Sequence, residues 1–393
     1  MRALPLACIV LALVGCVPPS STPPPPGEDQ RQLVLTRIVD GFALSRLQSL
    51  ASQSSALHDA TLALEASAGA DDAARADARA ALTTLQATWQ QLEVLQLGAA
   101  GSPATFTGGQ ALRDGINSWP QVSPCSADQQ VVQNRFTEDG WVQGRLVNVL
   151  GLHTLEYLLF RADADNACPA AASINSNGTW AALGAAEITA RRATYARVLA
   201  ADVLGKSTAL SAAWTNGFAN ELKTAGAGST LFPSAQQALD EVYAALFFVE
   251  LTTKDKKLAI PAGLHVDCAA AVCPDLTESP FARLSVKHIE HNLRGVRHVF
   301  LGTDDLDTNG AGFDDLLKNA GHNDAATTMV AALDAAVDAA ATFDGTLEDA
   351  LTTEPERARA LHATVKIFTD ELKNNVPSLL GVRVPDEGAG DND

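Results

Sequence analysis

Apolar residues recur every three or four positions along most of the chain, which is the spacing of one face of an α-helix. Residues 31–68 show this pattern without an interrupting proline, at Leu33, Ile38, Leu44, Leu47 and Leu50. The same spacing predicts further helices over 71–97, 128–161, 179–204, 207–224, 234–254, 280–301, 322–343 and 354–375. No segment of useful length alternates apolar and polar residues as a half-buried strand does. The pattern therefore predicts an all-α fold.

The predicted helices fall into two sets of about four, and each set is interrupted by one long irregular crossover. Two such sets favour two packed helical-bundle domains rather than one. We expect the first bundle at residues 31–205 and the second at 206–381. Residues 382–393 are rich in Asp and Gly, and we expect an acidic, solvated tail there.

Residues 1–15 have the features of a secretory signal peptide. Arg2 supplies a positive charge, and the apolar run after it, from Ala3 to Val14, is too short for a stable membrane span. The segment Leu13-Val14-Gly15-Cys16 resembles the bacterial lipobox, in which the cysteine is acylated and becomes the mature N-terminus. We therefore expect a protein of the bacterial cell envelope, lipid-anchored through Cys16 on the periplasmic side or at the outer membrane. A plain signal peptide cleaved nearby is the alternative.

A proline-rich linker follows the signal segment at residues 16–30 and contains the run Pro23 to Pro26. Such a segment is extended and semi-rigid. We expect it to hold the folded part of the chain away from the membrane surface.

Four further cysteines indicate disulfides, because an exported protein meets an oxidising compartment. Cys268 and Cys273 lie in one loop, and their local pairing is the simplest of three connectivities. That pairing leaves Cys125 with Cys168. A zinc site built from four thiolates is the alternative, but the sequence has no Cys-x-x-Cys spacing.

The charge of the chain excludes some partners. Its 393 residues include 46 acidic and 28 basic side chains, which give a net charge of −18. Nucleic acid and anionic membrane surfaces are poor partners for such a protein, whereas cations are attracted to it. Hydrophobic residues make up 47% and charged residues 19% of the chain, a balance typical of a globular protein.

His153 and Glu156 lie on the apolar stripe of a segment that is hydrophobic on most sides, residues 146–160. Residues three apart share one face of a helix, and an unpaired buried carboxylate costs several kcal/mol. A hydrogen bond within the core could satisfy this pair. A metal ion could also do so, since neutral imidazole and carboxylate suit iron, zinc or manganese.

Glu93 offers a third ligand, because it occupies the buried stripe of the preceding helix after Leu82, Leu85, Trp89 and Leu92. Helical bundles build metal sites from carboxylates on facing helices. His153, Glu156 and Glu93 are therefore the predicted metal ligands. His288 and His291 are also three residues apart, but the charged neighbours Lys287, Glu290 and Arg294 favour a solvated face for them.

Several segments resemble motifs of the imelysin family. Gly151-Leu152-His153-Thr154-Leu155-Glu156 is similar to its Gly-x-His-x-x-Glu signature, and Asn117-Ser118-Trp119-Pro120 to its Asn-x-Trp-Pro element. Trp89 to Glu93 resembles the family's Trp-x-x-x-Glu helix, without the arginine expected nearby. In the second half, Glu278-Ser279 and Asn292-Leu293 resemble further family segments, but Ala282 stands where a second serine is expected. The resemblance covers most of residues 31–381.

The resemblance implies a helical fold of two bundle-like domains, a place in the cell envelope and a link to iron uptake. It also implies a divalent metal ion as cofactor, possibly iron, with zinc not excluded, and iron-transport components as partners. Trp89 and Tyr157 are expected to surround the metal ligands, and Asn117 and Trp119 to shape the adjacent loop. The family also carries a peptidase label, but Tyr157 stands where a zincin motif requires its second histidine. A metallopeptidase and a structural lipoprotein without metal therefore stay as alternative functions.

Overall fold

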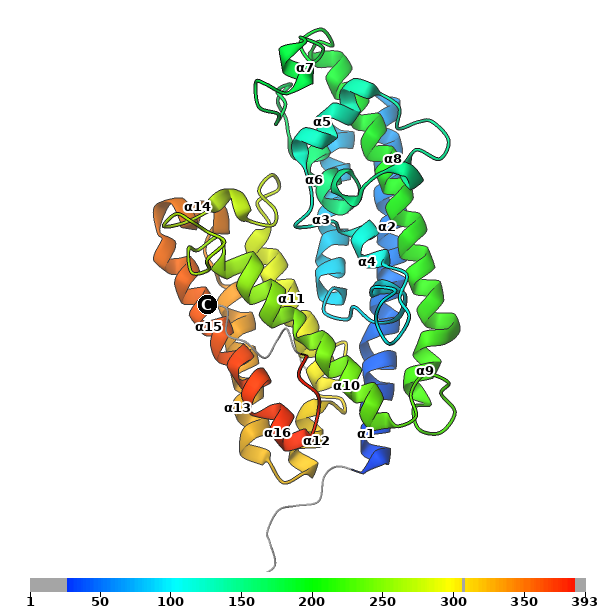
Figure 1. Cartoon of the computed structure of the whole chain (residues 1–393), viewed down its shortest axis with the longest axis vertical. Coiled ribbons are helices and arrows are strands. Elements are labelled where there is room, and N and C mark those ends of the chain that lie inside the picture. Colours follow the sequence, from blue (N-terminus) through cyan, green and yellow to red (C-terminus); the bar gives the residue numbers. More distant parts are fainter. Residues whose placement is uncertain (1–26, 306–307, 386–393) are drawn as a thin grey trace, which may run out of the picture.

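The computed structural model describes residues 27–305 and 308–385, and all regular structure in these ranges is helical (Figure 1). The helices of the first half are α1 (Glu28–Ile38), α2 (Leu44–Ala66), α3 (Asp72–Leu92), α4 (Leu112–Ile116), α5 (Pro124–Gln133), α6 (Gly151–Phe160), α7 (Ser173–Ser176), α8 (Ala185–Ala213) and α9 (Ala219–Lys223). The second half contains α10 (Ala235–Leu246), α11 (Ser285–Leu301), α12 (Phe313–Asn319), α13 (Asn323–Ala341), α14 (Leu347–Thr353), α15 (Pro355–Asn374) and α16 (Val376–Leu380). The all-α prediction is confirmed.

Within the described residues, three segments are wound as π-helices, in which each amide bonds five residues back. They are η1 (Val39–Ala43), η5 (Trp214–Phe218) and η6 (Val249–Ala259). The first joins α1 to α2 and the second joins α8 to α9 without a break in the helix. The third, η6, replaces the second part of the helix predicted over 234–254.

Two groups of helices lie side by side (Figure 1). Helices α2, α3, α6 and α8 pack against one another in the first group, and α11, α13, α15 and η6 pack together in the second. The groups meet where α11 packs against α3, and their buried apolar residues form one continuous cluster. The predicted boundary between residues 205 and 206 falls inside α8, so the chain crosses this position as continuous helix.

The prediction of one long helix over 128–161 is wrong. Helix α5 ends at Gln133, an irregular segment with two short 3-10 turns follows, and α6 begins only at Gly151. Gly151 explains this late start, because its φ of +75° is strained for any other residue. A Cβ at this position would also lie 2.7 Å from the carbonyl oxygen of Ile116. The glycine therefore lets α6 start against α4, two residues before His153.

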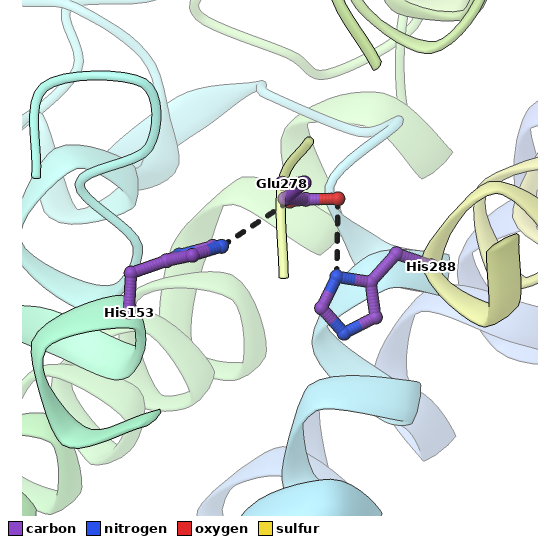
Figure 2. A group of neighbouring side chains, drawn as sticks. All are labelled: His153, Glu278 and His288. Carbon is purple, nitrogen blue, oxygen red and sulfur yellow. Dashed lines mark ion pairs between the residues drawn. The ribbon is translucent and has the colours of Figure 1, made fainter. Parts of the chain in front are cut away.

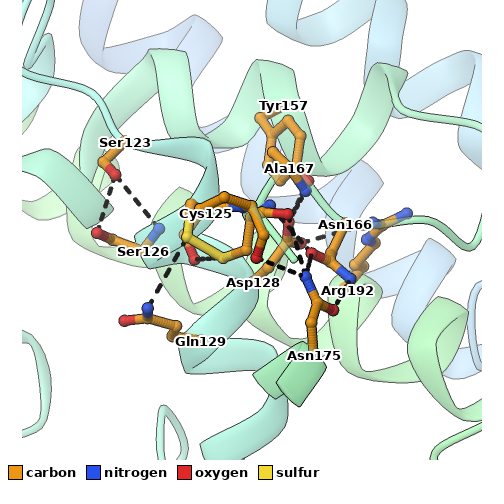
Figure 3. The surroundings of a disulfide bond; sticks show 12 residues. Ser123, Cys125, Ser126, Asp128, Gln129, Tyr157, Asn166, Ala167, Asn175 and Arg192 are labelled. Carbon is orange, nitrogen blue, oxygen red and sulfur yellow. Dashed lines mark hydrogen bonds and ion pairs between the residues drawn. A yellow bond between two sulfur atoms is a disulfide. The ribbon is translucent and has the colours of Figure 1, made fainter. Parts of the chain in front are cut away.

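Both predicted disulfides are confirmed. Cys125 on α5 pairs with Cys168 in the loop after α6 (Figure 3), and Cys268 pairs with Cys273 in the loop before α11. The second loop leads directly to the segment that holds Glu278.

The predicted signal peptide, Cys16 and most of the Pro-rich linker lie outside the described residues, as do the last eight residues of the predicted tail. The linker was predicted to extend to residue 30, but α1 already begins at Glu28. Among the described helices, none combines the length and the apolar content needed to cross a bilayer.

Candidate metal centre

Three ligand-type side chains from separate elements meet where the two helix groups face each other. They are His153 on α6, Glu278 in the loop before α11, and His288 on α11 (Figure 2). Glu278 lies between the two histidines, with Oε1 at 3.7 Å from His153 Nε2 and Oε2 at 3.1 Å from His288 Nδ1. The three side chains are almost fully buried, with exposed fractions of 4% for His153 and 1% for each of the other two. We call these three residues the candidate metal centre.

Asn117, directly after α4, orients the ring of His153. Its amide Nδ2 donates to Glu93 Oε1 at 3.1 Å, which leaves its Oδ1 facing His153 Nδ1 within hydrogen-bond distance. Because an amide oxygen only accepts, Nδ1 must carry the proton of the neutral ring. His153 Nε2 then holds a lone pair directed towards Glu278, and it finds no hydrogen-bond partner among the described residues. Burial lowers the pKa of His153 to about 4, so the ring is neutral at neutral pH.

Glu156, one turn after His153, holds the loop that carries Glu278. Its Oε1 accepts the backbone amides of Phe281 and Ala282 at 3.2 and 3.1 Å. Its Oε2 accepts the hydroxyl of Ser279 at 2.8 Å and the side-chain amide of Gln86 at 3.1 Å. Burial raises the pKa of Glu156, while these donors and the nearby His288 oppose that rise. The carboxylate therefore fixes the position of the loop.

Position 282 makes its polar contact through the backbone. The serine expected there is Ala282, whose amide nitrogen donates to Glu156 as described above. The side-chain hydroxyl is therefore not required for a polar contact at this position.

Lys257, on η6, is the cation of the cluster. Its Nζ is fully buried and lies 3.0 Å from both Glu93 Oε2 and Glu278 Oε2. Gln90 and Asn292 complete its surroundings, with acceptor oxygens at 2.6 and 2.8 Å. Burial alone would raise the pKa of Glu278, but Lys257 and then His288 hold it well below its usual value. Glu278 is therefore ionised at neutral pH.

In Glu93, as in Glu278, nearby cations oppose the effect of burial on the pKa. Burial opposes its ionisation, yet Lys257 and Arg113, the latter with its Nη2 3.3 Å from Glu93 Oε1, hold the pKa of this carboxyl below its usual value. The carboxylate is thus paired with two cations and with Asn117. It is not among the side chains that gather around Glu278 and the two histidines.

The candidate metal centre has donor types and spacings that fit a transition metal. Its three ligand atoms lie within 4.8 Å of one another. Two donors bound to one ion at about 2.1 Å are about 3.0–3.4 Å apart at octahedral and tetrahedral angles. The separations of 3.1 Å to Glu278 Oε2 and 3.7 Å to Glu278 Oε1 are close to that range, and the carboxylate has one oxygen facing each histidine. A histidine whose other nitrogen donates to a fixed acceptor, as His153 does to Asn117, is also typical of metal ligands.

The structure places the three predicted ligands differently. His153 belongs to the candidate metal centre. Glu156 and Glu93 do not belong to it, but each binds a residue or segment that positions one of its members. Glu156 binds the loop of Glu278, and Glu93 binds the amide of Asn117 that orients His153. Both carboxylates are buried, as predicted, but other donors already occupy their oxygens.

The two remaining members of the centre were not predicted as ligands. His288 was assigned to a solvated face, and this was wrong, because it is 1% exposed. Ser285, His288, Asn292 and Val296 lie at helical spacing on the buried side of α11, and this pattern could have identified it. Glu278 lies in a loop, where no periodicity marks a buried residue.

The comparisons with known proteins agree with this fold. The family model described as Imelysin matches residues 43–372. The structure is similar to that of a putative iron-regulated protein A precursor from Parabacteroides distasonis ATCC 8503, with a TM-score of 0.73, 18% identity, and 91% of this chain and 96% of that chain covered. It is also similar to an imelysin-like protein from Psychrobacter arcticum 273-4, with a TM-score of 0.70, 17% identity, and coverage of 92% and 98%. At these identities the two structures show the fold alone. No curated protein matched the sequence significantly.

Proposed function

Because the chain belongs to the imelysin family, we propose that it is a lipid-anchored protein of the bacterial cell envelope that binds a metal ion as an accessory to iron uptake. Iron is the ion we favour, and the donor set also suits zinc. One similar structure is that of a putative iron-regulated protein A precursor, which supports the link to iron. His153, Glu278 and His288 would hold the ion, and Asn117, Glu93 and Glu156 would position these ligands.

One observation carries this proposal: the lone pair of His153 Nε2 faces the ionised carboxylate of Glu278 across 3.7 Å. Glu278 Oε1 accepts the side-chain amide of Gln90 at 2.9 Å. The proton of the His153 ring is on Nδ1, where Asn117 accepts it, so no proton lies between Nε2 and Glu278 Oε1. Two electron-rich atoms that face each other in a buried site repel unless a cation lies between them. A metal ion bound by both atoms would supply that cation.

Metal binding can be measured on the purified protein after removal of bound metal. We expect Fe²⁺ or Zn²⁺ to bind at one site per chain in calorimetric titrations, and His153→Ala to weaken this binding at least about 100-fold, as expected for a lost ligand. His58→Ala is the matched control, because His58 lies on α2, outside the candidate metal centre. Equal affinity in all three proteins would refute the proposal.

A metallopeptidase using the same cluster receives less support from the geometry. Such an enzyme needs a carboxylate free to act as general base towards a metal-bound water. Glu156 accepts four hydrogen bonds, and Glu93 is paired with Lys257 and Arg113. Degradation of an unfolded test protein that is lost in Glu156→Gln, while metal binding is retained, would favour the peptidase instead.

The lipid anchor can be tested separately. We expect Cys16→Ala to abolish incorporation of labelled fatty acid and to release the protein from the membrane fraction, since acylation at this cysteine is the proposed anchor. Membrane association that persists in this variant would argue for another mode of attachment.

A further inference from the structure

A cavity of about 860 Å³ lies between the two helix groups and reaches the candidate metal centre. His153, Glu156 and Glu278 form part of its wall. Much of the rest of the wall is apolar and includes Trp119, Val122, Ile260, Leu276 and Phe281. Lys256, Asp267 and Asp275 are its further charged members. The cavity therefore combines a few convergent polar groups with a large apolar surface, as pockets for organic ligands do.

The volume of this cavity is too large for a metal ion alone. A water molecule occupies about 30 Å³, so an ion with six waters needs roughly 200 Å³. Pockets for organic molecules have volumes of about 300–1,000 Å³. A bare hydrated ion would leave most of the cavity filled with water against Trp119, Val122 and Phe281.

The charges around the candidate metal centre also indicate that the ion does not bind alone. Glu93 and Glu278 are the ionised carboxylates in direct contact with a buried cation, and Lys257 and Arg113 balance them. Glu156 adds at most one further buried negative charge, and the more exposed part of the cavity wall carries Asp267 and Asp275 against Lys256. A trivalent ion therefore brings more positive charge than these groups neutralise, and uncompensated buried charge is costly.

We propose that this protein binds its metal as a chelate, together with a small organic anion that has oxygen donors and an apolar or aromatic body. This inference rests on the proposed metal binding and specifies the chemical form of the ion. The anion balances the charge of the ion, and its oxygens fill the coordination positions that three protein ligands leave open. Its body packs against the apolar wall near Trp119 and Phe281.

Two iron complexes of the same donor type separate this idea from binding of the ion alone. Fe(III) with 2,3-dihydroxybenzoate has an aromatic chelator, whereas Fe(III) citrate has no apolar body. Equilibrium dialysis with the purified protein measures retained iron and retained chelator, and Fe²⁺ without chelator is titrated in parallel. We expect iron and dihydroxybenzoate to be retained together, about tenfold more tightly than the citrate complex, a difference of ~1.4 kcal/mol.

A charge placed in the apolar wall tests the role of the cavity. Leu276→Asp should weaken binding of the aromatic chelate about tenfold and leave binding of Fe²⁺ alone unchanged, because this side chain lines the cavity and is not part of the candidate metal centre. Leu276 is 44% exposed, so the change costs little stability. Leu62→Asp is the matched control, since Leu62 is 42% exposed and lies on α2 outside the cavity.

The outcomes distinguish the two proposals. If iron binds without retaining either chelator, and Leu276→Asp has no effect, binding as a chelate is overturned while metal binding stands. If the protein retains iron in none of the three forms, the proposed function fails and the chelate fails with it. Retention of dihydroxybenzoate with iron, lost in Leu276→Asp and kept in Leu62→Asp, supports both.

Discussion

Two buried carboxylates near α6 differ in how their surroundings satisfy them. Asp128, on α5, accepts the hydroxyl of Tyr157 at 2.5 Å and the amide of Ala167 at 2.7 Å, and Arg192 lies 3.6 Å from its other oxygen (Figure 3). Glu278 Oε1 accepts the side-chain amide of Gln90 at 2.9 Å, and Lys257 Nζ lies 3.0 Å from Oε2. Oε1 additionally faces His153 Nε2, which carries no proton (Figure 2). Both carboxylates are at most 1% exposed.

This comparison shows that burial alone does not separate a structural polar group from a functional one. In the Asp128 network each close contact pairs a donor with an acceptor, which is how buried polar groups are normally accommodated. Around Glu278, fixed tautomers and fixed charges leave two acceptors facing each other. The missing proton between His153 Nε2 and Glu278 Oε1 therefore distinguishes the candidate metal centre from the Asp128 network.

The same substitution at both carboxylates gives the largest expected contrast. Glu278→Gln should weaken metal binding at least about 100-fold, because a charged ligand is replaced by a neutral amide. Asp128→Asn should leave the metal affinity unchanged and lower the free energy of unfolding, since it alters only the network with Tyr157 and Arg192. Calorimetric titration and urea denaturation of both variants measure these effects. A similar loss of metal affinity in the two variants would contradict the distinction.

Glu156→Gln should produce the next largest effect. A glutamine has one acceptor oxygen where Glu156 serves four donors, so the loop of Glu278 loses part of its support. We expect the metal affinity to fall about 10–100-fold, the range typical of residues that position metal ligands. Asp314→Asn is the control, because Asp314 is equally buried but lies on α12, outside the candidate metal centre. If Glu156→Gln and Asp314→Asn bind metal equally well, Glu156 has no positioning role.

Tyr157→Phe tests the structural network alone. It removes the hydroxyl donor to Asp128 and should lower the free energy of unfolding by about 1–3 kcal/mol, because the buried carboxylate loses one of its two hydrogen-bond donors. Urea denaturation measures this loss, and the metal affinity should be unchanged. A loss of metal affinity with intact stability would mean that the two regions are coupled through α6.

The smallest expected effect concerns His298, a buried histidine outside the candidate metal centre. It stacks on Phe42, its Nδ1 lies 2.9 Å from the carbonyl oxygen of Thr303, and burial lowers its pKa to about 4. The unfolded chain, with a pKa near 6.5, binds the proton first as the pH falls. This histidine therefore favours folding above pH 6.5 and loses that contribution as the pH falls from 6.5 towards 4.

His298→Phe removes this titration and keeps an aromatic ring against Phe42. Between pH 7 and 6 the free energy of unfolding should fall by about 0.7 kcal/mol less in the variant than in the parent protein. Urea denaturation at a series of pH values measures the two slopes. Identical slopes would show that His298 does not contribute to the pH dependence.

Two long helices of the second half could be predicted closely from the sequence. The segments predicted at 322–343 and 354–375 form α13 (Asn323–Ala341) and α15 (Pro355–Asn374), because regular apolar spacing and clear end signals act locally. The segment at 128–161 could not be predicted in this way. Its apolar residues are numerous enough to look helical, but Gly151 and the residues before it follow contacts with distant parts of the chain.

The candidate metal centre was partly predictable for a similar reason. His153, Glu156 and Glu93 interrupt apolar stripes, so their burial could be inferred from spacing. Their partners could not, because Glu278 lies in a loop and Lys257 lies in a π-helix, where the period of 3.6 residues does not hold.

By itself, the sequence determined the all-α fold, the buried His153 and Glu156, and the two disulfide pairings. Each of these follows from local spacing or from the few ways in which four cysteines can pair. Only the tertiary structure decided which groups meet. It brought Glu278 and His288 to His153, and it gave Glu156 and Glu93 to neighbouring donors, because contacts between distant segments depend on how whole helices pack.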